Sequence, residues 1–244
     1  MPVTVITGTS TGIGQTTALH LARKGHTVWA TMRNPAAGGA PLTEAATTEG
    51  LDLRLLALDV DNDDSVERGM AEVFAASGQV DVLVNNAGIG GAKSLEETSD
   101  AELRAMMETN FFGAMRMVRA VLPGMRERQS GTIVNVTSVA GIVANAPQGP
   151  YAASKFALEA ASEVLAQEVL RFGIRVAIIE PGVIATPIFA KGADAFDPSS
   201  PYADLVRRIG RFFTKSLVNP TQPEAVAEAI EHAITTDSPK LRYP

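Results

Sequence analysis

Hydrophobic residues in this chain form short, nearly continuous runs that alternate with longer stretches of helical spacing. The runs predict strands at Val3–Thr7, Thr27–Thr31, Leu53–Leu58, Val82–Asn85, Thr132–Val136 and Arg175–Glu180. Because the runs lack an in-out alternation, they are typical of parallel strands buried on both faces. The stretches between them predict helices at Gly14–Lys24, Ala40–Thr48, Ser65–Ala76, Asp100–Met125, Pro150–Phe172 and Gln222–Thr235.

This alternation predicts a single α/β domain over residues 1–244. Right-handed crossovers between parallel strands would give a doubly wound, Rossmann-like sheet with helices on both faces. Such sheets bind ligands beyond the carboxyl ends of their strands, where the strand order reverses. We therefore expect the chemistry of this protein in the residues that directly follow each strand.

Local signals mark several element ends. Ser99-Asp100-Ala101-Glu102 and Thr221-Gln222-Pro223-Glu224 both fit capping boxes at helix starts. Gly173 fits the residue that follows a helix in the left-handed conformation. Leu241–Pro244 could begin a last edge strand.

Residues 182–219 interrupt the regular pattern and predict a substrate lid inserted before the last helix. Long irregular insertions in compact domains often serve a function. The segment carries apolar and aromatic side chains that would be costly to leave exposed: Ile188, Phe189, Phe196, Tyr202, Phe212 and Phe213. The alternative is a disordered surface excursion.

Composition narrows the classes of function. Hydrophobic residues make up 45% of the chain, enough for a large core, and the net charge of −6 gives no reason to expect nucleic acid or an anionic membrane as partner. There is no cysteine, and the histidines are scattered, so we predict no metal site. No charged leader and no membrane-length apolar run is present, so the expected location is cytoplasmic.

A glycine-rich segment follows the first predicted strand and opens a helix. It reads Thr7-Gly8-Thr9-Ser10-Thr11-Gly12-Ile13-Gly14, with the spacing G-x-x-x-G-x-G. Glycines let a phosphate approach the backbone, and a helix N-terminus offers free N–H groups to it. We therefore predict dinucleotide binding here; the alternative is a glycine-rich turn without a ligand.

Tyr151 and Lys155 are four residues apart at the start of a predicted helix. Residues at this spacing share one helix face, so the ammonium can lie beside the phenol. A nearby positive charge lowers the pKa of a phenol from its usual value of about 10. The pair is therefore a candidate acid/base unit, although the same spacing also suits an ordinary half-exposed helix face.

With these motifs the chain resembles a short-chain dehydrogenase/reductase over nearly its whole length. The resemblance also includes Asn85-Asn86-Ala87-Gly88 after the fourth strand, Ser138 after the fifth, and Pro181-Gly182 with Thr186 after the sixth. Asn110 stands within a predicted helix, where this family has its fourth catalytic residue.

The resemblance implies a role for each of these residues. Tyr151 would act as general acid or base, and Lys155 would lower its pKa and hold the nicotinamide ribose. Ser138 would polarise the substrate oxygen, and Asn110 would anchor a water that links Lys155 to solvent. Further implied cofactor contacts are Asp59, Val60, Asn86, Ala87, Gly88, Pro181, Gly182, Val183 and Thr186. Asp59 could equally cap the next helix.

The end of the second strand bears on the choice of cofactor. A carboxylate there binds the ribose 2′-hydroxyl of NAD, whereas an arginine accommodates the 2′-phosphate of NADP. No carboxylate occurs between Val28 and Asn34, and Arg33 offers a fork of donors to a phosphate. Ser10 and Thr11 could add hydroxyl contacts. The expected cofactor is NADP(H) rather than NAD(H).

The sequence thus predicts an NADP(H)-dependent oxidoreductase that interconverts a carbonyl and an alcohol on a small apolar substrate. Within the family, the chain looks most like the hydroxysteroid and retinol dehydrogenase branch. The family also implies a homodimer or homotetramer joined through the Asp100–Met125 and Pro150–Phe172 helices. Two alternatives stay open: a non-catalytic NADP-binding regulator or redox sensor, and an isomerase or dehydratase that uses the same Tyr–Lys pair.

Overall fold

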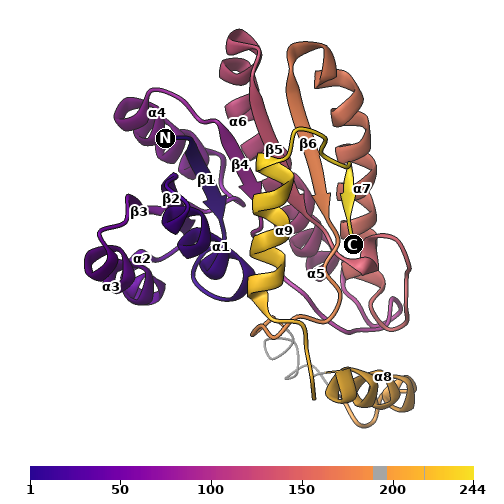
Figure 1. The fold of residues 1–244 in the computed structure, drawn as a ribbon. Coiled ribbons are helices and arrows are strands. Elements are labelled where there is room, and N and C mark those ends of the chain that lie inside the picture. The colour runs from indigo at the N-terminus through magenta and orange to yellow at the C-terminus, as the bar shows by residue number, and fades with distance from the viewer. Residues whose placement is uncertain (189–196, 217) are drawn as a thin grey trace.

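The described residues of the computed structural model are 1–188, 197–216 and 218–244. They contain one sheet of seven parallel strands in the order β3-β2-β1-β4-β5-β6-β7 (Figure 1). The strands are β1 (Val3–Thr7), β2 (Thr27–Met32), β3 (Leu53–Ala57), β4 (Val82–Asn85), β5 (Gly131–Val136), β6 (Ile174–Ile179) and β7 (Arg242–Tyr243). The strand order reverses between β1 and β4, which confirms the doubly wound α/β fold and its single domain.

Helices cover both faces of the sheet, as predicted (Figure 1). They are α1 (Gly12–Arg23), α2 (Pro35–Gly38), α3 (Ala40–Glu49), α4 (Asp63–Ser77), α5 (Asp100–Met107), α6 (Gly113–Arg128), α7 (Gly149–Val169), α8 (Ala203–Ser216) and α9 (Pro223–Thr235). Apolar residues of α4, α6 and α7 build the core on one face, and those of α1, α3 and α9 build the core on the other.

The two cores explain the continuous apolar runs. Val5 and Ile6 are neighbours in β1 and both are fully buried, but they belong to cores on opposite faces. A central strand therefore needs apolar residues at every position. The edge strand β3 departs from this prediction, because Leu56 is its only buried residue. An edge strand has a neighbour on one side only, so its side chains are less completely covered.

The long helix predicted over Asp100–Met125 is divided in the structure. A π-helical turn at Glu108–Phe112 separates α5 from α6. The segments on both sides of the turn are α-helical, as the apolar spacing predicts. The turn places the buried Asn110 at the centre of the interruption.

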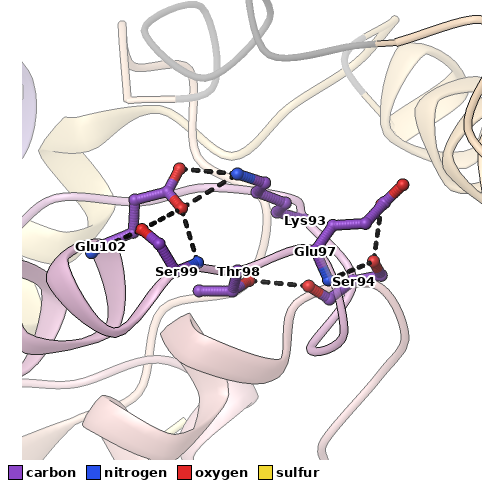
Figure 2. A network of polar contacts seen from close by, with 6 residues as sticks. All are labelled: Lys93, Ser94, Glu97, Thr98, Ser99 and Glu102. Atoms are coloured by element: carbon purple, nitrogen blue, oxygen red, sulfur yellow. Dashed lines mark hydrogen bonds and ion pairs between the residues drawn. The ribbon is translucent and has the colours of Figure 1, made fainter.

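One of the two predicted capping boxes forms. The Ser99 hydroxyl accepts from the N–H of Glu102 at 3.3 Å, and the Glu102 carboxylate accepts from the N–H of Ser99 at 2.8 Å. Figure 2 shows that Lys93 also reaches Glu102, at 2.7 Å, and this ion pair and the Ser99 bonds lower the pKa of Glu102 to about 2. The prediction of a second capping box at Thr221 is wrong, because α9 starts after Gln222 and has no side-chain cap.

The C-terminal half confirms two further predictions and corrects one. Gly173 has a left-handed φ of 67° and closes a 3-10 turn, Leu170–Phe172, after α7. Leu241–Pro244 contributes the edge strand β7. Within the segment predicted as an irregular lid, however, residues 203–216 form α8, which Figure 1 draws apart from the sheet and its helices. Phe189 and Phe196 lie outside the described residues.

Candidate active site

The carboxyl ends of β1, β4, β5 and β6 carry the segments that the motifs predicted. The loop after β1 leads into α1, and residues 86–88 follow β4. Ser138 follows β5, and Pro181 follows β6. Because these strands are neighbours in a parallel sheet, the four segments meet at the point where the strand order reverses.

Glycines shape the loop after β1 for close backbone approach. Gly8 and Gly12 have φ values of 71° and 62°, a region that favours glycine. A Cβ on Gly8 would stand 2.7 Å from the Cα of Ala87, and one on Gly14 would stand 2.4 Å from the carbonyl oxygen of Gly8. The loop therefore needs glycine both for its conformation and for its contact with the segment after β4.

Asn86 and Thr7 fasten these two segments together. The Asn86 side-chain amide donates to the carbonyls of Thr7 and Gly8, at 2.8 and 3.1 Å. In return, the Thr7 hydroxyl accepts from the backbone N–H groups of Asn86 and Ala87, each at 3.0 Å. Thr7 was not singled out from the sequence, although a threonine at the end of β1 beside a polar segment was the available signal.

The start of α1 is suited to an anion. Its N-cap residue Thr11 makes no side-chain hydrogen bond to the helix, and the first turn contains no acidic residue. The first backbone N–H groups of a helix have no partner within it, so they are available to a phosphate. Half-buried Ser10 and Ile13 flank Gly12 and complete the cradle. The residues present thus fit a dinucleotide.

Arg33 and Asp59 follow β2 and β3, on the opposite side of β1 from Ser138. Arg33 is exposed and has no hydrogen-bond partner in the described part of the chain. Asp59 does not cap α4: Asn62 does, accepting from the N–H of Ser65 at 2.8 Å. The Asp59 carboxylate instead accepts from the N–H of Asp61, and Val60 beside it is buried.

Tyr151 and Ser138 are brought together as predicted. The half-buried Tyr151 lies in the first turn of α7, and its phenol faces the Ser138 hydroxyl. Burial raises the pKa of Tyr151, and interaction with Ser138 only partly offsets this. The effect of burial on this pKa is the larger one, and a lowering of the pKa by Lys155 stays a prediction.

Lys155 is 4% exposed, and its ammonium lies 5.8 Å from the centroid of the Tyr151 ring. It donates to the carbonyl of Val136 at 3.0 Å. Burial lowers the pKa of Lys155 to about 8, against a smaller opposing effect of the Glu159 charge. The ammonium is thus charged at neutral pH but close to losing its proton.

Asn110 is fixed by several contacts in the π-helical turn. Its side-chain oxygen accepts from the N–H of Ile89 at 2.8 Å, and its amide donates to the carbonyl of Ile89 and to Ser154, each at 2.9 Å. The Ser154 hydroxyl donates to the carbonyl of Tyr151 at 2.7 Å. Ser154 therefore ties Asn110 to the catalytic helix, and the sequence offered no distinct signal for it.

Gly88 lies between the glycine loop and the Tyr–Lys pair. A Cβ there would stand 3.3 Å from the Asn110 side-chain oxygen and 3.7 Å from the Lys155 ammonium. The amide and the ammonium therefore face the same small volume. All four candidate catalytic residues, Asn110, Ser138, Tyr151 and Lys155, are assembled at one place.

The segment after β6 spans the site. The Pro181 carbonyl accepts from the N–H of Val139 at 3.1 Å and from the Ser138 hydroxyl at 3.4 Å. Farther along, the Thr186 methyl lies 3.0 Å from where a Cβ of Gly12 would be. Exposed Gly182 and half-buried Val183 stand between these two contacts. The segment thus connects the candidate catalytic residues with the glycine loop.

No group of three or more His, Cys, Asp or Glu side chains in the described ranges is arranged to hold a metal ion. None of the helices in the same ranges combines the length and apolar character needed to cross a bilayer.

Comparisons with known proteins agree with the fold. The family described as short chain dehydrogenase matches residues 2–195. A 3-ketodihydrosphingosine reductase of Bacteroides thetaiotaomicron is 35% identical over 98% of this chain and 86% of its own. Human retinol dehydrogenase 8 is 39% identical over 98% of this chain and 79% of its own.

A solved structure is similar throughout. It is an alcohol dehydrogenase from the archaeon Thermococcus sibiricus in complex with 5-hydroxy-NADP, with a TM-score of 0.83 and 28% identity. The match covers 100% of this chain and 95% of that one. The family match and these relatives show that the chain belongs to the short-chain dehydrogenase/reductase family of oxidoreductases, which use a nicotinamide cofactor. The doubly wound sheet, the glycine loop and the Ser–Tyr–Lys cluster fit this family.

The pKa of Lys155 predicts how stability depends on pH. Because this pKa lies near 8 in the folded chain, against 10.5 ordinarily, the folded state binds fewer protons than the unfolded state between these values. We expect the free energy of unfolding of the cofactor-free protein to rise from pH 8 toward pH 10.5, by up to about 1.4 kcal/mol per pH unit from this group. Urea unfolding at a series of pH values measures this rise.

The matched variants are Lys155→Met, which should lose the rise, and Lys240→Met at an exposed position, which should keep it. A Lys155→Met protein with the slope of the wild type would show that Lys155 has an ordinary pKa in the folded chain.

Proposed function

We propose that this protein is an NADP(H)-dependent oxidoreductase that interconverts a carbonyl group and a primary or secondary alcohol on an apolar substrate. The observation that carries the proposal is that the Ser138 hydroxyl faces the Tyr151 phenol, with the buried Lys155 ammonium one helical turn behind the phenol. A proton donor beside a second hydroxyl can bind and protonate one carbonyl oxygen.

Each residue has a proposed task. Tyr151 protonates the carbonyl oxygen during reduction, and its raised pKa keeps the proton on the phenol until it is needed. Ser138 donates a hydrogen bond to the same oxygen and polarises the carbonyl. Lys155 stabilises the phenolate that remains, and Asn110, which faces Gly88 together with Lys155, lies on the route by which the proton is replaced. The nicotinamide supplies the hydride.

The proposed cofactor is NADP(H). Gly8, Gly12 and Gly14 with the N-terminus of α1 would hold the pyrophosphate. Arg33, together with Ser10 and Thr11, would bind the 2′-phosphate, since no carboxylate competes between Val28 and Asn34. The remaining cofactor contacts would come from Asp59, Val60, residues 86–88, residues 181–183 and Thr186. The NADP analogue in the Thermococcus sibiricus relative supports this choice.

The proposed substrate is apolar. Ile89, Val139, Ile142 and Val143 follow the strands that carry the site and are 36–59% exposed, a clustering that suits an apolar ligand. We propose that residues 182–219, including α8, form the substrate lid. The named substrates of the two curated relatives, a retinol and a 3-ketodihydrosphingosine, are both largely hydrocarbon and support this reading.

We further propose that the protein is a homodimer or homotetramer joined through α5–α6 and α7. These helices and the π-helical turn between α5 and α6 expose large apolar side chains, among them Phe112 at 45%, Phe156 at 41% and Val164 at 53%. A second copy of the same chain would cover them. A cytoplasmic location stays a prediction.

Replacing Tyr151 with phenylalanine should abolish turnover and keep cofactor binding. The phenol is the only proposed proton donor, and such donors contribute about 10²- to 10⁴-fold to rate. The measurement is NADPH oxidation with steroid, retinoid, aromatic and short aliphatic carbonyl compounds, with NADPH affinity measured in parallel. Tyr243→Phe is the control, and an apolar substrate should be preferred. Retained turnover in Tyr151→Phe would remove Tyr151 from the acid role.

Replacing Arg33 with aspartate should reverse the cofactor preference. A charge-assisted hydrogen bond contributes about 1.5–3 kcal/mol, so KM for NADPH should rise by at least about tenfold. The introduced carboxylate should at the same time improve NADH, since it can bind the 2′-hydroxyl. Arg68→Asp, on the exposed face of α4, is the charge-matched control. A wild type that prefers NADH would contradict the role of Arg33.

Introducing a charge on the exposed face of α7 should dissociate the oligomer. Phe156→Glu places a carboxylate where the second copy would pack, and burial of an unpaired charge is strongly unfavourable. Multi-angle light scattering after size exclusion gives the mass directly, and Thr48→Glu on exposed α3 is the control. A monomeric wild type would refute the proposal.

A further inference from the structure

Behind the active site, α7 carries a buried carboxylate that the proposed chemistry does not use. Glu159 lies one turn beyond Lys155, as Lys155 lies one turn beyond Tyr151. Its side chain is 7% exposed, and one of its carboxylate oxygens is buried without a hydrogen-bond partner among the described residues. Gly141 packs against both turns, because a Cβ there would lie 3.0 Å from Cγ of Glu159 and 3.1 Å from the carbonyl of Lys155.

A second buried acid faces Glu159 from the end of β6. Glu180 is 2% exposed and directly precedes Pro181, whose carbonyl accepts from Ser138. Burial, and then the charge of Glu159, raise the pKa of Glu180, although Arg242 opposes this. Two carboxylates side by side in a buried site cannot both ionise freely, so one of them tends to hold a proton.

Arg242, from the last strand β7, is the one cation that bridges these acids in the described residues. Its Nε lies 3.2 Å from an oxygen of Glu159 and 3.2 Å from an oxygen of Glu180. A terminal nitrogen lies 3.4 Å from Glu163, which is half exposed. A single positive charge is thus divided among three carboxylates. Even with a proton on Glu180, the cluster keeps a net negative charge beside Lys155.

The other groups around Lys155 cannot supply that charge. Tyr151 is a neutral phenol with a raised pKa, Asn110 is a neutral amide, and Val136 offers only a backbone carbonyl. A buried ammonium without a nearby anion tends to lose its proton. Glu159, buried one helical turn beyond Lys155, is the acid whose charge opposes the effect of burial on the pKa of Lys155.

We propose that Glu159 is a positioning residue for the reaction: its buried carboxylate, oriented by Arg242, keeps the Lys155 ammonium charged in the active site. This inference rests on the proposed function, in which Lys155 acts as a cation beside the phenol. If the cluster only fastened β7 to α7, its loss would affect stability and leave the charge of Lys155 unaltered.

The test compares Glu159→Gln, which removes the charge, with Glu159→Asp, which restores it, and with Glu163→Gln as a control one turn farther along α7. Arg242 keeps Glu180 as a partner in every variant, so folding should be retained. Protein labelled with ¹³C at lysine Cε is titrated without cofactor, and Lys155→Met identifies the resonance. The wild-type midpoint should lie near pH 8.

In Glu159→Gln this midpoint should fall by about one pH unit, a tenfold loss of proton affinity. It should recover toward the wild type in Glu159→Asp and stay unchanged in Glu163→Gln. An unchanged midpoint in Glu159→Gln would overturn the proposal, whatever its activity.

The pH profile of kcat/KM for carbonyl reduction is the second readout. In Glu159→Gln the alkaline limb should move to lower pH, so that activity returns as the pH is lowered. A loss that is equal at all pH values would assign Glu159 a structural role only. A wild type without turnover but with the expected shift of the Lys155 resonance would refute the proposed function and leave the control of Lys155 by Glu159 supported.

Discussion

The burial of one positive charge organises this protein more than any other single interaction. Lys155 is almost completely removed from solvent, and a lone ammonium in such a place would discard its proton. Two surrounding groups stabilise the charged form of Lys155: the Val136 carbonyl accepts a hydrogen bond from the ammonium, and Glu159 provides an opposite charge. The phenol of Tyr151 stands at the other end of the same helical stripe. The chemistry of the site therefore depends on the buried charges along α7.

A second constraint is the contact between the loop after β1 and the segment after β4. It leaves no room for a Cβ at Gly8 or Gly14. Asn86 and Thr7 then hold the two segments in register with direct hydrogen bonds. The conformation of the glycine loop is thus fixed by contacts within the chain, and the same contacts join the two halves of the sheet.

The fold could be read from the sequence because the central strands must be apolar at every position, as Val5 and Ile6 illustrate. The motifs could also be placed, because each directly follows a strand. The properties of the site that the sequence does not predict depend on groups that are far apart in the chain. The raised pKa of Tyr151 comes from burial, and the pairing of Glu159 with Glu180 and Arg242 joins three elements. The failed box at Thr221 and the helix α8 show that local patterns alone do not settle helix ends or insertions.

The π-helical turn at Glu108–Phe112 has a consequence for how this protein can change over evolutionary time. Each residue added to or removed from a helix rotates everything beyond it by about 100°. The π-helical turn is wound more widely than the α-helices on either side of it. In this conformation Asn110 reaches Ser154 and Ile89. Restoring regular winding by a one-residue deletion would turn either Asn110 or the packed face of α6 away from its partners. This stretch should therefore accept substitutions on its outer surface far more readily than any insertion or deletion. The number of residues in it is more tightly constrained than their identity.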